Sequence, residues 1–451
     1  MGILSKYQTI DATCMEYVHP WTQSCADGSC SLFFHAVQHS GRLYFTVYML
    51  SLLMHRRVPS LQKLKNTFLG ILQSTAFLTA NAFGYSLSLC FLRAIMGNFN
   101  FLTISFVPSF MASLVAILVE RPSRRNLLTL YVTNVASETL FRMAVWRKIV
   151  RPIPYGDVII FASSIAAILH MYRSEHGSKD SIFSMLRVAI GPHEEYSATG
   201  TGRDTPPVPS NRPHKPKGPL FECLESFLAP YYCLMNKLKR HSTCPHPSSC
   251  VGYSVKGGLK MFAVGYGLQF CMRVLLRAKR LMKNPSQIPG MLIDKKMLSL
   301  GLFLGGFPAI FRTVSCALRW IRNTDSPAHA IPAGLLAGLA FVSYRDNSVA
   351  LYAFWKLMEI LYARAVSRGL LPQLPGAGVL LYCTSTALLF HAAIWEPQNL
   401  RPSYWDFLHG ISGGRLACMD RDVLEVFGLE TRKNLTALLM KNKTDLTKLK
   451  F

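Results

Sequence analysis

The stretch RRNLLTLYVTNVASETLFRM, residues 124–143, has a counterpart in RDNSVALYAFWKLMEILYAR, residues 345–364. Arg124, Asn126, Leu130, Tyr131 and Glu138 recur at a constant spacing of 221 residues. The same spacing relates five later pairs, namely Pro154 and Pro375, Val158 and Val379, Ser164 and Ser385, Ala166 and Ala387, and His170 and His391. A repeat of this length has to be recognised before a fold is assigned. In apolar sequence it is typical of a duplicated membrane protein with a pseudo-twofold axis.

The composition also indicates a membrane protein. Hydrophobic residues make up 50% of the chain, and only 16% are charged, against about 25% in soluble domains. The formal charge is +25, but the basic residues flank apolar segments as topology signals do. A nucleic-acid-binding protein would instead gather them on one recognition surface. We therefore expect membrane lipids, and no nucleic acid, as partners.

Apolar stretches predict the membrane spans, because a helix needs roughly 20 mostly apolar residues to cross a bilayer. Four stretches fall in each half of the chain. They are Thr67–Leu92, Phe101–Val119, Leu127–Trp146 and Val158–Tyr172 in the first half, and Met297–Leu318, Ala328–Tyr344, Val349–Tyr362 and Gly378–Trp395 in the second. The sequence thus predicts an all-α, multi-pass integral membrane protein, built as an internal duplication of two four-span repeats.

Two shorter apolar stretches, Leu43–Met54 and Met261–Met272, precede the two sets of spans. Each is only about 12 residues long and has basic residues at both ends, which favours an interfacial helix. With eight spans, most basic residues between spans fall on one face, together with the linker and the tail. The positive-inside rule then predicts that this face is cytosolic.

These features predict four regions along the chain. Residues 1–173 form the first repeat, with a cysteine cap, an interfacial helix and four spans, and residues 222–400 form the second with the same parts. Residues 174–221 are a largely disordered linker, because Pro, Gly, Ser and Thr dominate it and no apolar run is present. Residues 401–451 are a basic peripheral tail.

Glu138 and Glu359 occupy equivalent places in the third predicted span of each repeat. A carboxylate at that depth is costly unless it is paired or hydrated, so it is a candidate functional group. Arg142 stands four residues after Glu138, and Lys356 three residues before Glu359, which is the spacing of neighbours on a helix. Two interpretations stay open: a self-neutralised polar face inside the bundle, or a polar pathway between the repeats.

Small residues at four-residue spacing predict where helices pack closely in lipid. The candidate positions are Ala112 and Ala116, Gly301 and Gly305, and Gly334 and Gly338.

Cysteines also recur in the two halves, at Cys14, Cys25 and Cys30 and again at Cys233, Cys244 and Cys250, with histidines nearby. They could hold a metal ion, form disulfides or stay reduced, since the paired spacing of a zinc motif is absent. The chain carries no phosphate-binding loop, metalloprotease motif or nucleophile elbow. We therefore expect no enzyme activity and no cofactor.

Several longer strings carry a family resemblance: LQSTAFLTAN at 72–81, ILVERPSRRNLLTLYVTNVASETLFRM at 117–143, LRWIRNTDSPAHAIPAGLLAG at 318–338 and LRPSYWDFL at 400–408. Over nearly the whole chain it resembles the transmembrane protein 135 family, also called peroxisomal membrane protein 52. The stretch Cys223–Cys250 fits that family's cysteine-rich region. The span sets are more distantly similar to the mitochondrial inner-membrane translocase channel family.

The resemblance implies a non-enzymatic, multi-pass protein of mitochondrial and peroxisomal membranes. It further implies roles in mitochondrial fission through a dynamin-like GTPase, in peroxisome organisation and in lipid metabolism. The alternative function is a transporter or channel, with Glu138 and Glu359 lining a polar path between the repeats. A transporter or channel would have a water-accessible cavity that reaches both carboxylates. A protein that acts only as a membrane scaffold would lack such a cavity.

The tail provides a first test of topology. Its two glycosylation sequons, Asn434-Leu435-Thr436 and Asn442-Lys443-Thr444, should stay unmodified, because basic residues close to a span resist translocation. Protease added to intact organelles should remove a C-terminal epitope without detergent. An epitope that is protected until detergent is added would reverse the predicted orientation and with it the eight-span count.

Overall fold

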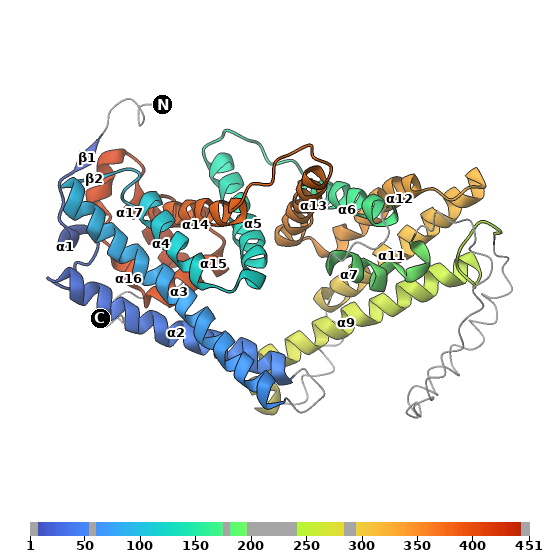
Figure 1. The fold of residues 1–451 in the computed structure, drawn as a ribbon, viewed down its shortest axis with the longest axis horizontal. Helices are drawn as coiled ribbons and strands as arrows, with labels where there is room; N and C mark the ends of the chain where they lie inside the picture. The colour runs from blue at the N-terminus through green and yellow to red at the C-terminus, as the bar shows by residue number, and fades with distance from the viewer. Residues whose placement is uncertain (1–7, 54–59, 175–180, 196–240, 284–294, 443–451) are drawn as a thin grey trace. The chain divides into compact units, whose positions relative to one another are not determined.

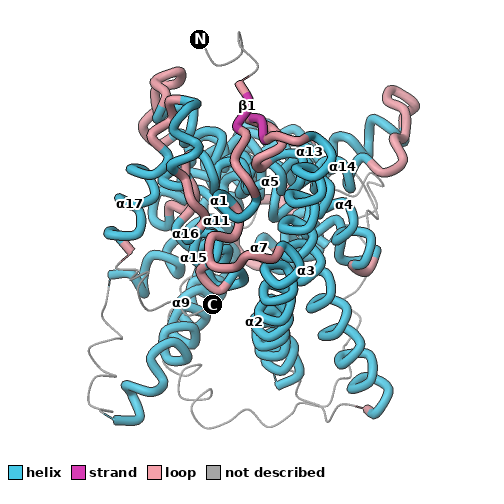
Figure 2. Tube along the Cα trace, turned by 90° about the vertical axis from the view of Figure 1, so that its left-hand side faces the viewer, coloured by secondary structure: helices cyan, strands magenta, loops and turns pink. Residues whose placement is uncertain are grey.

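The computed structural model describes residues 8–53, 60–174, 181–195, 241–283 and 295–442. These residues are mostly helical, and seven of the eight predicted spans lie within helices, while Phe101–Val119 begins five residues before α4. The described sheet is one short antiparallel pair, β1 (Thr9–Ile10) with β2 (Phe99–Asn100), in magenta in Figure 2. The all-α prediction is therefore confirmed. Most of the predicted linker, together with Cys233, lies outside the described residues.

The chain divides into two compact units. The first unit comprises Met1–Pro152 and Val366–Phe451. Its helices are α1 (Cys14–Tyr17), α2 (Cys25–Leu53), α3 (Leu61–Met96), α4 (Phe106–Val119), α5 (Pro122–Trp146), α14 (Ala377–Trp395), η5 (Pro397–Asn399), α15 (Pro402–Ser412), α16 (Arg415–Cys418), η6 (Asp422–Phe427) and α17 (Thr431–Lys441).

The second unit comprises Ile153–Ala365. Its helices within the described residues are α6 (Gly156–Ser174), α7 (Ser181–Ile190), η1 (Pro192–Glu194), α9 (Cys250–Lys283), α11 (Lys295–Arg322), η3 (Pro327–His329), α12 (Ala330–Gly338), η4 (Leu339–Tyr344) and nearly all of α13 (Asn347–Ser367).

The units do not coincide with the predicted repeats, because each repeat contributes its fourth predicted span to the other unit. Helix α14 packs on α4 and α5 in the first unit, and α6 packs on α12 in the second. Helix α6 presents Ala162 and Ala166 to Gly338 and Gly334 of α12, where backbones meet closely. The predicted end of the first repeat, at residue 173, therefore differs from the boundary between the two compact units, at Pro152–Ile153. The duplication itself stays a prediction.

The two short apolar stretches predicted to be interfacial belong to much longer helices. Helix α2 has 29 residues and α9 has 34, and they pack along α3 and α11 respectively. Figure 1 shows α2 beside α3. Between α9 and α11 the contact is backbone to backbone, since a Cβ at Gly265 would lie 2.8 Å from the Leu300 carbonyl oxygen. The two stretches predicted as short interfacial helices are therefore parts of the long arms of helical hairpins.

Among the described residues, five helical segments are long and apolar enough to cross a membrane: Leu61–Met96, Gly156–Ser174, Met297–Arg322, Pro327–Tyr344 and Ala377–Trp395. Helix α4 is apolar but has only 14 residues. Helices α5 and α13 contain the ionisable residues noted in the sequence. A multi-pass membrane protein is thus supported, and the count of eight spans stays a prediction.

The sharp turn between α4 and α5 follows from its sequence. Pro122 begins α5, where its missing N–H costs nothing. The last carbonyl oxygens of α4 need other donors. Arg125 donates to the Leu118 and Glu120 carbonyls, at 2.8 and 3.0 Å, and Gln73 donates to that of Val119 at 2.8 Å. A basic residue that flanks an apolar segment therefore also caps a helix.

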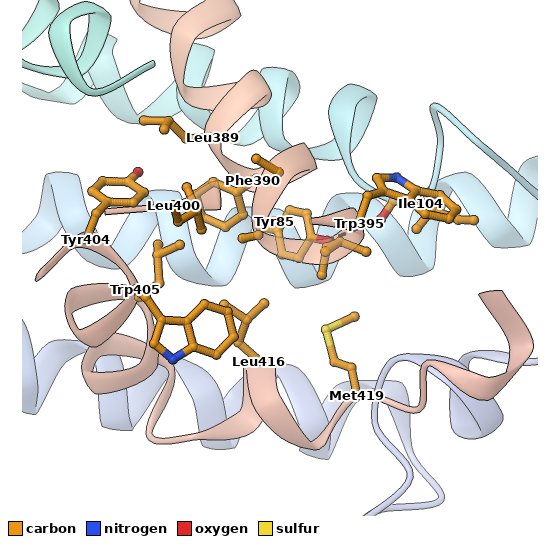
Figure 3. Close-up of a cluster of buried hydrophobic side chains, with 14 of the residues drawn as sticks. Tyr85, Ile104, Leu389, Phe390, Trp395, Leu400, Tyr404, Trp405, Leu416 and Met419 are labelled. Carbon is orange, nitrogen blue, oxygen red and sulfur yellow. Dashed lines mark hydrogen bonds between the residues drawn. The ribbon is translucent and has the colours of Figure 1, made fainter. Parts of the chain in front are cut away.

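The C-terminal segment is part of the core of the first unit. Trp405, Leu416 and Met419 are buried against residues of α3 and α14 such as Tyr85 and Phe390 (Figure 3). Leu424 of η6 is 0% exposed. This differs from the predicted peripheral tail, because the apolar face of α15, with Tyr404 and Leu408, and apolar residues of the short helices after it cover the bundle.

A pair of glycine variants tests the close helix contact in the second unit. A Cβ at Gly338 would lie 2.5 Å from the Ala162 Cα, so Gly338→Ala should destabilise the protein by about 1–3 kcal/mol. Gly267 of α9 has no neighbour within 4 Å, so Gly267→Ala should be neutral or stabilising by up to about 1 kcal/mol. Thermal unfolding in detergent measures both, and equal effects would contradict the contact.

Candidate functional site

Four metal-binding side chains meet in the second unit. Cys244 and His246 lie in the loop before α9, Cys250 is the first residue of α9, and Cys316 lies near the end of α11. All four are buried, and their donor atoms lie within 4.8 Å of one another. His246 Nε2 is 3.3 Å from Cys316 Sγ, and Cys250 Sγ is 3.7 Å from Cys244 Sγ. We call these four residues the second cluster.

The His246 ring is fixed in the orientation a ligand needs. Its Nδ1 lies 2.7 Å from the Ser248 carbonyl oxygen, which can only accept, so Nδ1 carries the proton. The ring also stacks on Tyr253, with centroids 4.3 Å apart. Nε2 is therefore left with its lone pair among the three thiols. A backbone carbonyl on the other nitrogen is the usual support of a metal-bound histidine.

A similar but more open arrangement occurs in the first unit, where Cys25 is exposed and the histidine contacts Cys25 alone among the three thiols. The Sγ atoms of Cys14, at the start of α1, Cys25, at the start of α2, and Cys90, in α3, lie within 4.8 Å of one another. His19 Nε2 is 3.3 Å from Cys25 Sγ, and His19 Nδ1 is 3.0 Å from the Thr22 carbonyl oxygen. The histidine has the same tautomer and the same support as His246. We call these four residues the first cluster.

Each cluster stabilises one thiolate. The hydrogen bond from Cys316 is the largest cause that lowers the pKa of Cys244, to about 4, against the opposing effect of burial. The hydrogen bond from Cys90 likewise lowers the pKa of Cys14 to about 6. A thiolate is the form of cysteine that binds a metal. Both clusters thus present a charged donor at neutral pH.

An arginine beside each helical cysteine supports the loops around the cluster. Arg93 follows Cys90 by three residues and donates to the Ala12 carbonyl at 2.8 Å and to that of Asp11 at 3.0 Å. Arg319 follows Cys316 by three residues. It pairs with Glu194 at 2.8 Å and with Asp325 at 3.0 Å. Each guanidinium therefore joins the end of a long helix to neighbouring chain segments.

The structure corrects the predicted cysteine grouping. Cys30 is exposed on α2 and belongs to neither cluster, and Cys233 lies outside the described residues. Cys90 and Cys316 were missed because the loop cysteines were compared only with each other. The signal was present, since both stand in the pattern Cys-x-Leu-Arg, at 90–93 and 316–319.

Glu138 is buried within the first unit and is doubly paired. Its carboxylate contacts the predicted partner, Arg142, at 2.5 Å. It also accepts a hydrogen bond from Arg401 Nε at 3.0 Å, a partner from the segment before α15. Two cations thus offset the cost of burying one carboxylate.

Glu359 has a different environment in the second unit. It pairs with Lys356 at 2.9 Å, as its spacing predicts, but the Glu359 side chain is 36% exposed while that of Lys356 is 8% exposed. The two carboxylates occupy corresponding positions in the repeats, but Glu138 is buried and Glu359 is partly exposed.

The small-residue positions lie at helix contacts. Ala112 of α4 faces Gly84 of α3, while Gly301 and Gly305 of α11 face Phe262 of α9. Ala116 is fully buried. Gly334 and Gly338 contact α6, as described above.

Cavities in the first unit are apolar. One of about 180 Å³ is lined by residues of α2, α3, α5, α14 and α15, including Phe77, Tyr382 and Tyr404. Another, of about 520 Å³, lies between α2 and α3 and includes Phe45 and Phe68. Glu138 is in the wall of neither cavity.

The fold and these sites define a helical multi-pass membrane protein with a Cys/His cluster in each compact unit. The family model for the N-terminal cysteine-rich region of Transmembrane protein 135 matches residues 11–145. This match supports the resemblance to the transmembrane protein 135 family found in the sequence. The cysteine-rich region of the family thus lies here, and not at Cys223–Cys250 as expected. No solved structure matches the chain.

The unequal burial of the two carboxylates makes a prediction. Glu138→Gln should destabilise the protein by about 2 kcal/mol or more, because it leaves two arginines without their anion. Glu359→Gln should cost less than about 1 kcal/mol, because the Glu359 side chain is 36% exposed and is not enclosed by two cations. Thermal unfolding of the purified variants in detergent compares them. A larger loss of stability for Glu359→Gln than for Glu138→Gln would contradict the deeper burial of Glu138.

Proposed function

We propose that this protein is a non-enzymatic protein of mitochondrial and peroxisomal membranes. In this proposal it regulates mitochondrial fission, peroxisome organisation and lipid metabolism. The observation that carries the proposal is the family match over residues 11–145, together with the resemblance along the remaining chain. The apolar helices support the membrane location in general terms.

The environment of the buried charges favours a scaffold over a transport path. Glu138 is held by Arg142 and Arg401, and it is not in the wall of either apolar cavity described above. A transport site needs an ionisable group that can exchange its partner for a substrate or an ion. The Glu138 carboxylate already has two tight partners. A transporter or channel is therefore the less supported alternative.

Basic side chains offer a surface for partners. Lys63 and Lys65 are exposed at the start of α3, and Arg277 is exposed near the end of α9. All three belong to the face that the charge distribution predicts to be cytosolic. Such residues attract anionic lipid by about 1 kcal/mol each. In the proposal this face also recruits a dynamin-like fission GTPase.

Removal and replacement of the protein in cells test this proposal. Cells without the protein should have longer mitochondria and fewer GTPase foci on them. A tagged copy should localise with mitochondrial and peroxisomal markers and should restore normal mitochondrial length and the number of foci. The double variant Lys63→Glu, Lys65→Glu should restore them poorly, because it reverses charge on the proposed recruiting face. Arg151→Glu is the matched control, since Arg151 is also exposed but lies on the opposite predicted face.

Two results would count against the proposal. Unchanged mitochondrial length in cells that lack the protein would exclude the role in fission. Solute or ion flux through purified protein in vesicles, abolished by Glu138→Gln in protein that remains folded, would favour the transporter.

A further inference from the structure

The two clusters share one design in the described parts of both units. In each, the donors follow the order Cys, His, Cys, Cys along the chain: Cys14, His19, Cys25 and Cys90, then Cys244, His246, Cys250 and Cys316. The third donor is the first residue of a long helix, α2 or α9. The fourth lies near the C-terminal end of the next long helix, α3 or α11.

In the second cluster the donor separations are close to those around one tetrahedral ion, and in the first cluster the separation of His19 from Cys25 is similar. With Zn–S near 2.3 Å and Zn–N near 2.0–2.1 Å, neighbouring ligand atoms of a tetrahedron lie about 3.5–3.8 Å apart. The observed separations are 3.7 Å between Cys250 and Cys244 and 3.3 Å from His246 to Cys316. The separation from His19 to Cys25 is also 3.3 Å. An iron–sulfur cluster would hold its thiolates farther apart, because several iron and sulfide atoms lie between them.

The donor chemistry selects the metal. Three soft thiolates and one imidazole favour Zn²⁺, whereas Ca²⁺ and Mg²⁺ require oxygen ligands. Each histidine turns Nε2 inward and fixes Nδ1–H on a backbone carbonyl, of Thr22 or of Ser248. Such support orients the ligand before the metal arrives.

We propose that each cluster binds one Zn²⁺, so that the chain carries two Cys₃His zinc centres. Four protein ligands close the coordination sphere, so the centres are structural and leave no position for a substrate. Each zinc ties the loop and the start of a hairpin's first helix to the far end of its second helix. The free energy of metal binding thereby stabilises both hairpins.

Metal analysis of the full-length protein tests the proposal. Protein purified in detergent under reducing conditions should contain two zinc atoms per chain by mass spectrometry. Cys316→Ser and Cys90→Ser should each lower the content by one. Cys30→Ser and Cys271→Ser are matched controls, because both thiols are exposed and lie outside the clusters. These two variants should keep both metals.

A measurement on the unaltered protein keeps the test independent of variants that fail to fold. X-ray absorption at the zinc edge should show on average three sulfur ligands and one nitrogen ligand per metal, near 2.3 and 2.0 Å. Protein that is folded and free of zinc, or that joins Cys244 to Cys250 in a disulfide, would overturn the proposal. If the protein contains a single zinc that is lost only in Cys316→Ser, the proposed zinc centre in the first cluster is wrong.

Discussion

The close approach of helix backbones is the constraint on which this fold rests. In lipid the apolar side chains gain little by meeting one another, so helices associate through tight packing and hydrogen bonds. At Gly338 against Ala162, and at Gly265 against Leu300, no side chain could be inserted. These contacts align α6 with α12 and α9 with α11. Packing of this kind explains why the compact units follow helix contacts and not the order of the predicted repeats.

Buried charges join distant parts of the chain within each unit. Glu138 of α5 holds Arg401, and Arg421 donates to the carbonyls of Ala393 and Ile394 at the end of α14. In the second unit Arg319 holds Glu194. A buried charge without its partner is strongly destabilising. The C-terminal segment is therefore fixed by ion pairs and hydrogen bonds as well as by its apolar residues.

The Cys/His clusters lie at the ends of the helical hairpins, where loops meet helix termini. In the second cluster two donors come from a loop and two from helices, whereas in the first cluster only His19 lies outside a helix. A closed coordination sphere at such a place would hold a hairpin together without chemistry of its own. This agrees with the proposed non-enzymatic function, in which the bundle positions a basic face toward its partners.

Local sequence was enough to predict the helices and the local ion pairs. Apolar runs located the helices, apart from residues 101–105 of one predicted span, and helical spacing alone brought Arg142 to Glu138 and Lys356 to Glu359. Contacts between distant segments were not predictable in this way. Arg401 at Glu138, α14 beside α4, and Cys90 and Cys316 among the loop cysteines each depend on how whole helices pack. Hydropathy and periodicity report the surroundings of one helix, whereas the choice of its neighbour follows from the fit between two surfaces.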